Sequence, residues 1–149
     1  MYKQILVAVD GSPTSMRGLR EAIGLAQATG AKLLLVHVVT ELLSPDLAAS
    51  SYYNQVIEAV REAGKKVLES AAAVAREAGV PFEQRLVSGL GERPADLIVQ
   101  EAKTAGADLI ALGTHGRRGL KRLALGSDAE LVLRSSHVPV LLVREQPEE

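Results

Sequence analysis

The sequence predicts an α/β fold in which five parallel strands form a doubly wound sheet with helices on both faces. Short apolar runs alternate with longer segments whose apolar residues recur at helical spacing. The runs are uninterrupted, which is typical of parallel strands buried on both faces. The order of elements is β-α-β-α-β-α-β-α-β, which implies a parallel sheet with right-handed crossovers, and the expected strand order is 3-2-1-4-5.

The strands are expected at the apolar runs. Residues 5–9, 33–39, 109–112 and 140–143 are rich in aliphatic and β-branched side chains. The run over residues 82–87 contains three polar side chains, which favours an edge of the sheet: Glu83, Gln84 and Arg85. The last run is expected at the other end of the strand order.

Helices are expected between the strands. Ser12 is the expected cap of a first helix that begins with Pro13 and ends at Gly30. The second helix is expected over residues 51–78 and is the longest, and a third is expected over residues 94–106. One apolar stripe of the second helix is predicted to face the sheet: Val56, Val60, Ala63, Val67, Ala71, Val74 and Ala78.

Length and composition indicate a single domain over residues 1–144, followed by a short acidic tail at 145–149. Of the 149 residues, 47% are hydrophobic and 23% charged, and the net charge is −1. The net charge is therefore too small to attract nucleic acid or an anionic membrane electrostatically. The chain has no cysteine, which excludes disulfides and thiolate catalysis and fits a cytoplasmic protein.

The most informative stretch is a glycine-rich run between the fourth strand and the last helix. It places glycines at Gly113, Gly116 and Gly126, followed by Ser127. Ser127 to Glu130 matches the S-x-x-E capping box, so the last helix is expected to begin there. Glycines let backbone N–H groups approach phosphate oxygens, and a helix N-terminus favours negative charge. The run therefore predicts a phosphate-binding loop.

The predicted topology brings this loop next to Asp10. Ligands of open α/β sheets bind beyond the carboxyl ends of the strands, where the strand order reverses. In the order 3-2-1-4-5 that point lies between the first and fourth strands, which end near Asp10 and Gly113. Asp10 has two interpretations: its carboxylate accepts a hydrogen bond within a turn, or it accepts hydrogen bonds from ribose hydroxyls.

These features resemble the universal stress protein family. The resemblance rests on residues 113–127, 7–12 and 36–38, and extends from Tyr2 to Val143. It implies a doubly wound α/β fold that commonly forms dimers. One branch of the family binds ATP through the glycine motif, and another branch lacks the motif and does not bind ATP.

The matching residues divide by the part of the nucleotide that the resemblance assigns to them. Asp10 and Gly113 would contact the ribose, and the backbone N–H and C=O of Val38 would contact the adenine edge. His37, beside Val38, is expected to be a hydrogen-bonded histidine at a strand end and not a ligand or base. The phosphates would be surrounded by three residues: Gly116, Gly126 and Ser127.

Charged residues near the glycines also bear on nucleotide binding. Four cations form either a solvated basic face or partners for outer phosphate oxygens: Arg117, Arg118, Lys121 and Arg122. RNA binding is disfavoured because aromatic residues are few and none lies nearby. Asp128 stands where the family has a small apolar or hydroxyl residue. Its carboxylate complements the helix dipole but repels a bare polyphosphate unless Mg²⁺ or Mn²⁺ bridges the two.

The functional expectation is an ATP-binding stress-response module, with AMP or ADP as alternative ligands, and not a dedicated enzyme. Asp10 and His115 are the only candidates for acid–base chemistry, and the sequence shows no partner for either. Hydrolysis is therefore expected to be slow at most. Two alternatives stay open: a nucleotide-free homodimeric interaction protein and an adenylate-transfer enzyme.

A homodimer is expected through the last strand. Its four residues are apolar and β-prone: Val140, Leu141, Leu142 and Val143. Pairing with the same strand of a second copy about a two-fold axis would satisfy the backbone groups of an open edge, and the family commonly dimerises in this way. Neither nucleic acid nor a membrane is an expected partner.

Overall fold

The computed structural model describes residues 1–41, 45–115 and 125–145. In these ranges five parallel strands form one sheet in the order β3-β2-β1-β4-β5, which confirms the predicted fold class and strand order. The strands are β1 (Gln4–Ala8), β2 (Lys32–Glu41), β3 (Phe82–Leu90), β4 (Leu109–Gly113) and β5 (Val140–Val143).

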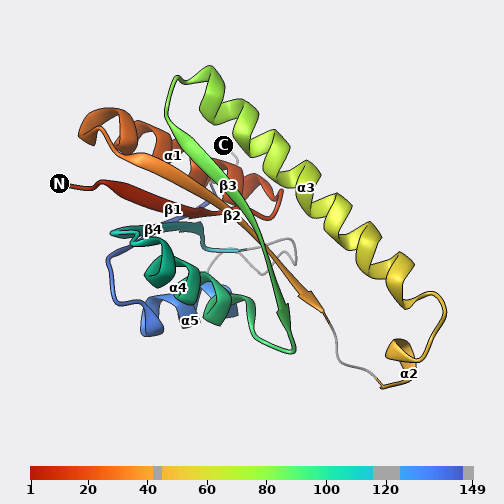
Figure 1. Cartoon of the computed structure of the whole chain (residues 1–149). Helices are drawn as coiled ribbons and strands as arrows, with labels where there is room; N and C mark the ends of the chain where they lie inside the picture. The colour runs from red at the N-terminus through yellow and green to blue at the C-terminus, as the bar shows by residue number, and fades with distance from the viewer. Residues whose placement is uncertain (42–44, 116–124, 146–149) are drawn as a thin grey trace.

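Helices cover both faces of the sheet. They are α1 (Pro13–Thr29), α2 (Pro45–Ala48), α3 (Tyr53–Glu77), α4 (Pro94–Ala105) and α5 (Ser127–Ser135). Figure 1 shows α1 and α3 on one face and α4 and α5 on the other. The short α2 was not predicted. None of the helices in the described ranges is both long and apolar enough to cross a bilayer.

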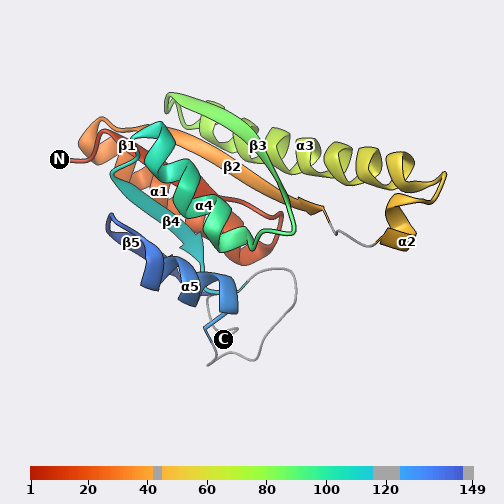
Figure 2. The ribbon, with the colours of Figure 1, turned by 60° about the horizontal axis from the view of Figure 1, so that its bottom comes forward.

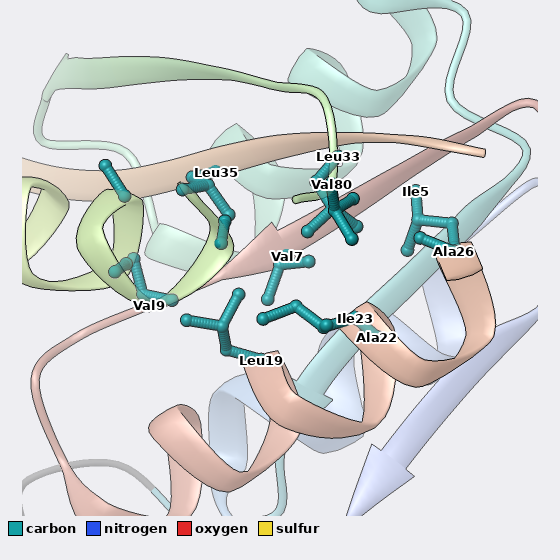
Figure 3. Packing of buried hydrophobic residues seen from close by; sticks show 14 of the residues in the cluster. Ile5, Val7, Val9, Leu19, Ala22, Ile23, Ala26, Leu33, Leu35 and Val80 are labelled. Carbon is teal, nitrogen blue, oxygen red and sulfur yellow. The ribbon is translucent and has the colours of Figure 1, made fainter. Parts of the chain in front are cut away.

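The core consists of two layers because side chains alternate along each strand. Ile5, Val7 and Leu33 pack against α1 and α3, as Figure 3 shows for this layer. Leu6 and Leu34 pack in the other layer, against α4 and α5. All five side chains are 0% exposed. Burial on both faces explains why these strands are continuous apolar runs.

Capping residues set both ends of α1 and the C-terminal end of α4 as predicted. The Ser12 hydroxyl accepts a hydrogen bond from the Ser15 N–H at 3.1 Å, and Pro13 occupies the first helical position of α1. Gly30 and Gly106 follow α1 and α4 with φ of 76° and 70°. This left-handed conformation suits glycine and ends each helix.

The edge position predicted for β3 is confirmed, although the strand is longer than expected and ends at Leu90. Glu83 pairs with Lys32 of β2, and Arg85 pairs with a carboxylate of α4. The hydrogen bond and charge of the Lys32 ammonium hold the pKa of the Glu83 carboxyl below its usual value. Charged side chains on an edge strand discourage pairing with another chain.

The N-terminal half of α3 differs from the prediction. Val67 and Ala71 are buried, but Val56 and Val60 are 44% and 42% exposed. Ala63 is also exposed. Figures 1 and 2 show this half of the helix extending beyond the body of the sheet, beside the end of β2. Periodicity identifies the apolar face of a helix but does not indicate how far the sheet beneath it extends.

Two matched substitutions on α3 test this assignment. Val67→Ala removes methyl groups from a packed side chain that is 9% exposed, and should lower the free energy of unfolding by about 1–3 kcal/mol. Val60→Ala removes the same atoms from an exposed position and installs a better helix former, so the change should stay within about 0.5 kcal/mol. Urea denaturation measures both, and equal losses would contradict the assignment.

Candidate functional site

The chain reverses its strand order between β1 and β4. These strands pair directly, with Val7 opposite Ala111, and β2 lies on the other side of β1. The helices that follow them, α1 and α5, lie on opposite faces of the sheet (Figure 2). Asp10 and Gly113, at the carboxyl ends of the two strands, therefore occupy the switch point that the sequence predicts.

Asp10 begins the turn from β1 into α1. Its Oδ1 accepts a hydrogen bond from the Ser12 N–H at 2.8 Å, and its own N–H donates to the Ser15 hydroxyl at 3.2 Å. The structure thus contains the turn contact considered from the sequence. A carboxylate has about four acceptor positions, so this contact is compatible with a second role towards ribose hydroxyls.

Gly113 packs against the first turn of α1. A Cβ at this position would lie 2.7 Å from Thr14 Cγ2 and 3.0 Å from the Thr14 carbonyl carbon, closer than side chains tolerate. The glycine therefore permits the close approach of β4 and α1. This packing role was not predicted, and a ribose contact at Gly113 stays a prediction.

Gly126 joins the start of α5 to the end of β4. Its N–H donates to the Thr114 carbonyl at 2.7 Å, and a Cβ at Gly126 would lie 2.8 Å from the same oxygen. The Thr114 N–H donates in turn to the Val143 carbonyl at 3.0 Å. Any side chain at Gly126 would disturb this backbone contact first, so a larger residue there is a poor probe of ligand binding.

The start of α5 differs from the predicted capping box. Gly126 is the N-cap in an extended conformation, Ser127 is the first helical residue, and no side chain caps the helix. The prediction that Ser127 caps α5 is therefore wrong, because the bond from Gly126 to Thr114 fixes the glycine at the cap position. Ser127 and Asp128 are both exposed in the first turn of the helix.

The backbone of Val38 is presented beside the end of β1. The β1–β2 register ends at Ala8 opposite Val36, and the Val9 N–H donates to the Val36 carbonyl at 2.9 Å. Successive residues of a strand direct their backbone groups to opposite neighbours. Val38 therefore directs its N–H and C=O to the same side as Val36, at the level where the chain leaves β1 and turns through Asp10.

Of the remaining candidate site residues, only His115 lies within the part of the chain that the structure describes. His115 Nδ1 lies 2.9 Å from the Thr114 hydroxyl, so both acid–base candidates have partners that the sequence did not reveal. Gly116 and Arg117 lie outside the described residues, as do Arg118, Lys121 and Arg122. In the described ranges, no group of three or more His, Asp or Glu side chains could hold a metal ion.

Two supporting residues were missed by the sequence analysis. Ser15 and Thr114 are 4% and 5% exposed, and each connects segments at the switch point. Buried hydroxyl groups need hydrogen-bond partners, which is why both make such contacts. A serine three positions after a helix cap is a weak sequence signal, because the spacing alone does not show that its hydroxyl accepts from the Asp10 N–H.

Comparison with known proteins agrees with this arrangement. The sequence model of the Universal stress protein family matches residues 1–144. Universal stress protein MJ0531 of Methanocaldococcus jannaschii is 34% identical over 149 residues, which cover 100% of this chain and 86% of that protein.

Solved structures share the whole fold. Hypothetical protein MJ0577 superposes with a TM-score of 0.85 at 28% identity, covering 99% of each chain. A universal stress protein in complex with cAMP gives 0.72 at 30% identity, covering 95% of this chain and 97% of that one. The Archaeoglobus fulgidus protein in complex with dAMP gives 0.68 at 28% identity, covering 95% and 98%. The match over residues 1–144 shows that this chain belongs to the universal stress protein family.

Proposed function

We propose that this protein binds an adenine nucleotide across the carboxyl ends of β1, β2 and β4 and acts as a nucleotide-responsive regulatory module in the stress response. One observation carries the proposal: three kinds of recognition group meet at the switch point of the sheet. They are the backbone of Val38, the carboxylate of Asp10 and the N-terminus of α5. The similar structures in complex with cAMP and dAMP support an adenine ligand.

The adenine ring is the part of the ligand that Val38 would recognise. A backbone N–H and C=O on one strand edge offer a donor and an acceptor side by side. Adenine presents an acceptor at N1 and a donor at its 6-amino group, which complement that pair. Guanine reverses the two positions, with the acceptor O6 in place of the amino donor and an N1–H donor in place of the acceptor. A base held in the same orientation would then face like groups, so the backbone pair favours adenine.

The ribose and phosphates would lie towards β4 and α5. The Asp10 carboxylate would accept hydrogen bonds from ribose hydroxyls while Oδ1 keeps its contact with the Ser12 N–H. The backbone N–H groups in the first turn of α5, together with the Ser127 hydroxyl, would bind phosphate oxygens. ATP is the proposed ligand, with AMP and ADP as alternatives, and Mg²⁺ or Mn²⁺ would be held mainly by the phosphates.

We propose a regulatory protein and not a dedicated enzyme. Asp10 is engaged by the Ser12 N–H and His115 by the Thr114 hydroxyl, so each supports local structure. A general base acts on a substrate proton within hydrogen-bond reach, whereas these contacts orient Asp10 and His115 within the protein's own turns. Any hydrolysis would be slow and would depend on a metal bound with the phosphates.

The strongest alternative is a nucleotide-free homodimeric interaction protein. It is favoured by the packing roles of Gly113 and Gly126, which the fold needs whether or not a ligand binds. Native mass spectrometry of freshly purified protein separates the two. A mass increase equal to an adenine nucleotide supports the binding protein, and its absence even after ATP is added supports the alternative.

Asp10→Asn tests the ribose contact while preserving the turn. The asparagine oxygen can still accept from the Ser12 N–H, but the charge and one acceptor oxygen are lost. ATP affinity measured by calorimetry should fall by about 1–3 kcal/mol, the scale of a lost hydrogen bond to a charged group. Urea denaturation, measured in parallel, shows whether the variant is folded. Unchanged affinity in the folded variant would rule out the ribose contact.

Asp128→Asn tests the negative charge at the start of α5. If the carboxylate repels phosphate, the variant should bind metal-free ATP about two- to fivefold more tightly, most clearly at low salt. Glu130→Gln is the matched control, because Glu130 lies in the same first turn but already pairs with Arg134 at 2.8 Å. Weaker Mg-ATP binding by Asp128→Asn would instead show that the carboxylate helps to hold a metal ion.

We further propose that the protein forms a homodimer through β5, which lies at an edge of the sheet. The carbonyls of Pro139 and Val143 accept hydrogen bonds from the Ile110 and Thr114 N–H groups of the neighbouring chain segment. By alternation, Leu142 directs its N–H away from β4. An outward row of donors and acceptors on an apolar strand is suited to pairing with a second copy.

Leu142→Pro tests this dimer. Proline removes the outward N–H of Leu142, so the variant should be monomeric when light scattering is measured at tens of micromolar. Leu142→Ala is the control, because it trims the same side chain but keeps the N–H, and it should remain dimeric. A monomeric unmodified protein under these conditions would contradict the arrangement.

A further inference from the structure

His37 connects the end of β1 to β2 through its side chain. The residue lies on β2 between Val36 and Val38, and its Nδ1 is 2.8 Å from the Val9 carbonyl oxygen. A carbonyl oxygen can only accept, so a hydrogen bond between these atoms requires the proton on Nδ1. The expectation of a hydrogen-bonded histidine is confirmed, but His37 lies within β2 and not at its end, because the strand continues to Glu41.

Gly64 of α3 holds the imidazole from the other side. A Cβ at Gly64 would lie 2.7 Å from His37 Cδ2 and 2.8 Å from Leu86 Cδ1. Gly64 is buried in the interior of a 25-residue helix, where glycine costs about 1 kcal/mol relative to alanine. The space needed by the imidazole accounts for this unfavourable residue. The ring is therefore confined between the backbone of α3 and the Val9 carbonyl.

The Val9 carbonyl needs a partner because Val9 is 3% exposed. The Val9 N–H donates to the Val36 carbonyl. If the parallel ladder continued regularly, the next hydrogen bond would run from the Val38 N–H to the Val9 carbonyl. His37 supplies a hydrogen bond to that carbonyl from a side chain. The Val38 N–H can then serve a ligand without leaving the Val9 carbonyl unsatisfied.

We propose that His37 is a positioning residue of the nucleotide site. By donating from Nδ1 to the Val9 carbonyl, it fixes Asp10, the next residue along the chain, relative to Val38, the residue that follows His37 on β2. These are the two residues proposed to contact ribose and adenine, so the inference rests on the proposed function. His37 itself need not touch the nucleotide.

The protonation state of His37 in the unmodified protein is the first test. Nitrogen-15 NMR distinguishes a protonated from an unprotonated Nδ1 without any substitution. The proposal requires that Nδ1 carries a proton near neutral pH. An unprotonated Nδ1 would overturn it, whatever the variants below show.

Two substitutions then separate the donor from the bulk of the ring. His37→Leu fills the space but cannot donate, whereas the amide nitrogen of His37→Asn can donate from near the position of Nδ1. AMP affinity by calorimetry should fall about tenfold in His37→Leu and stay within about threefold of the unmodified protein in His37→Asn. A folded His37→Leu that binds AMP within twofold of the unmodified protein would overturn the proposal, as would equal impairment of the two variants.

The amide chemical shift of Asp10, measured without ligand, separates this proposal from the proposed function. It should move in His37→Leu and return towards its original value in His37→Asn. If the unmodified protein binds no adenine nucleotide, the proposed function fails, but the shifts still show whether His37 positions Asp10. An Asp10 amide that is the same in all three proteins would overturn the positioning role. If His37→Leu does not fold, the Nδ1 test and the affinity of His37→Asn decide the matter.

Discussion

The burial of β1 on both faces and both edges is the constraint on which the rest of the structure depends. Ile5, Leu6 and Val7 are 0% exposed, with β2 and β4 on either side and helices above and below. A strand enclosed in this way can end only where the chain turns away to one face of the sheet. The connections α1 and α5 leave towards opposite faces of the sheet. At the carboxyl ends of β1 and β4, backbone N–H and C=O groups therefore no longer face a neighbouring strand.

The polar groups at that end are satisfied by side chains instead of by a further strand. Asp10 and Ser15 form hydrogen bonds within the turn after β1, and the His37 side chain lies within hydrogen-bond distance of the Val9 carbonyl. The backbone of Val38 is directed towards the end of β1 by the alternation along β2. The same constraint that completes the core thus produces a set of positioned donors and acceptors, which is why the universal stress protein fold is suited to a ligand with a base, a sugar and phosphates.

The sequence predicts features that depend on local residue patterns and misses those that depend on contacts between segments far apart in the chain. Continuous apolar runs and glycine stops are local, so the strands and the glycine-terminated ends of α1 and α4 were predicted correctly, and the alternation of strands and helices led to the correct strand order. The exposure of Val60 was not, because it depends on where the sheet beneath α3 ends. The packing role of Gly113 and the cap at Gly126 depend on Thr14 and on the Thr114 carbonyl, contacts that no sequence spacing reveals.

The central claim is that an adenine nucleotide binds at the switch point of the sheet, and backbone amide NMR during a titration with AMP tests it most directly. The largest shifts should fall on the residues that meet at that point: Asp10, Val38, Gly113, His115, Ser127 and Asp128. GTP should cause smaller shifts at Val38, because guanine does not complement its backbone pair. Shifts confined to the exposed half of α3, or none at millimolar AMP, would contradict the account.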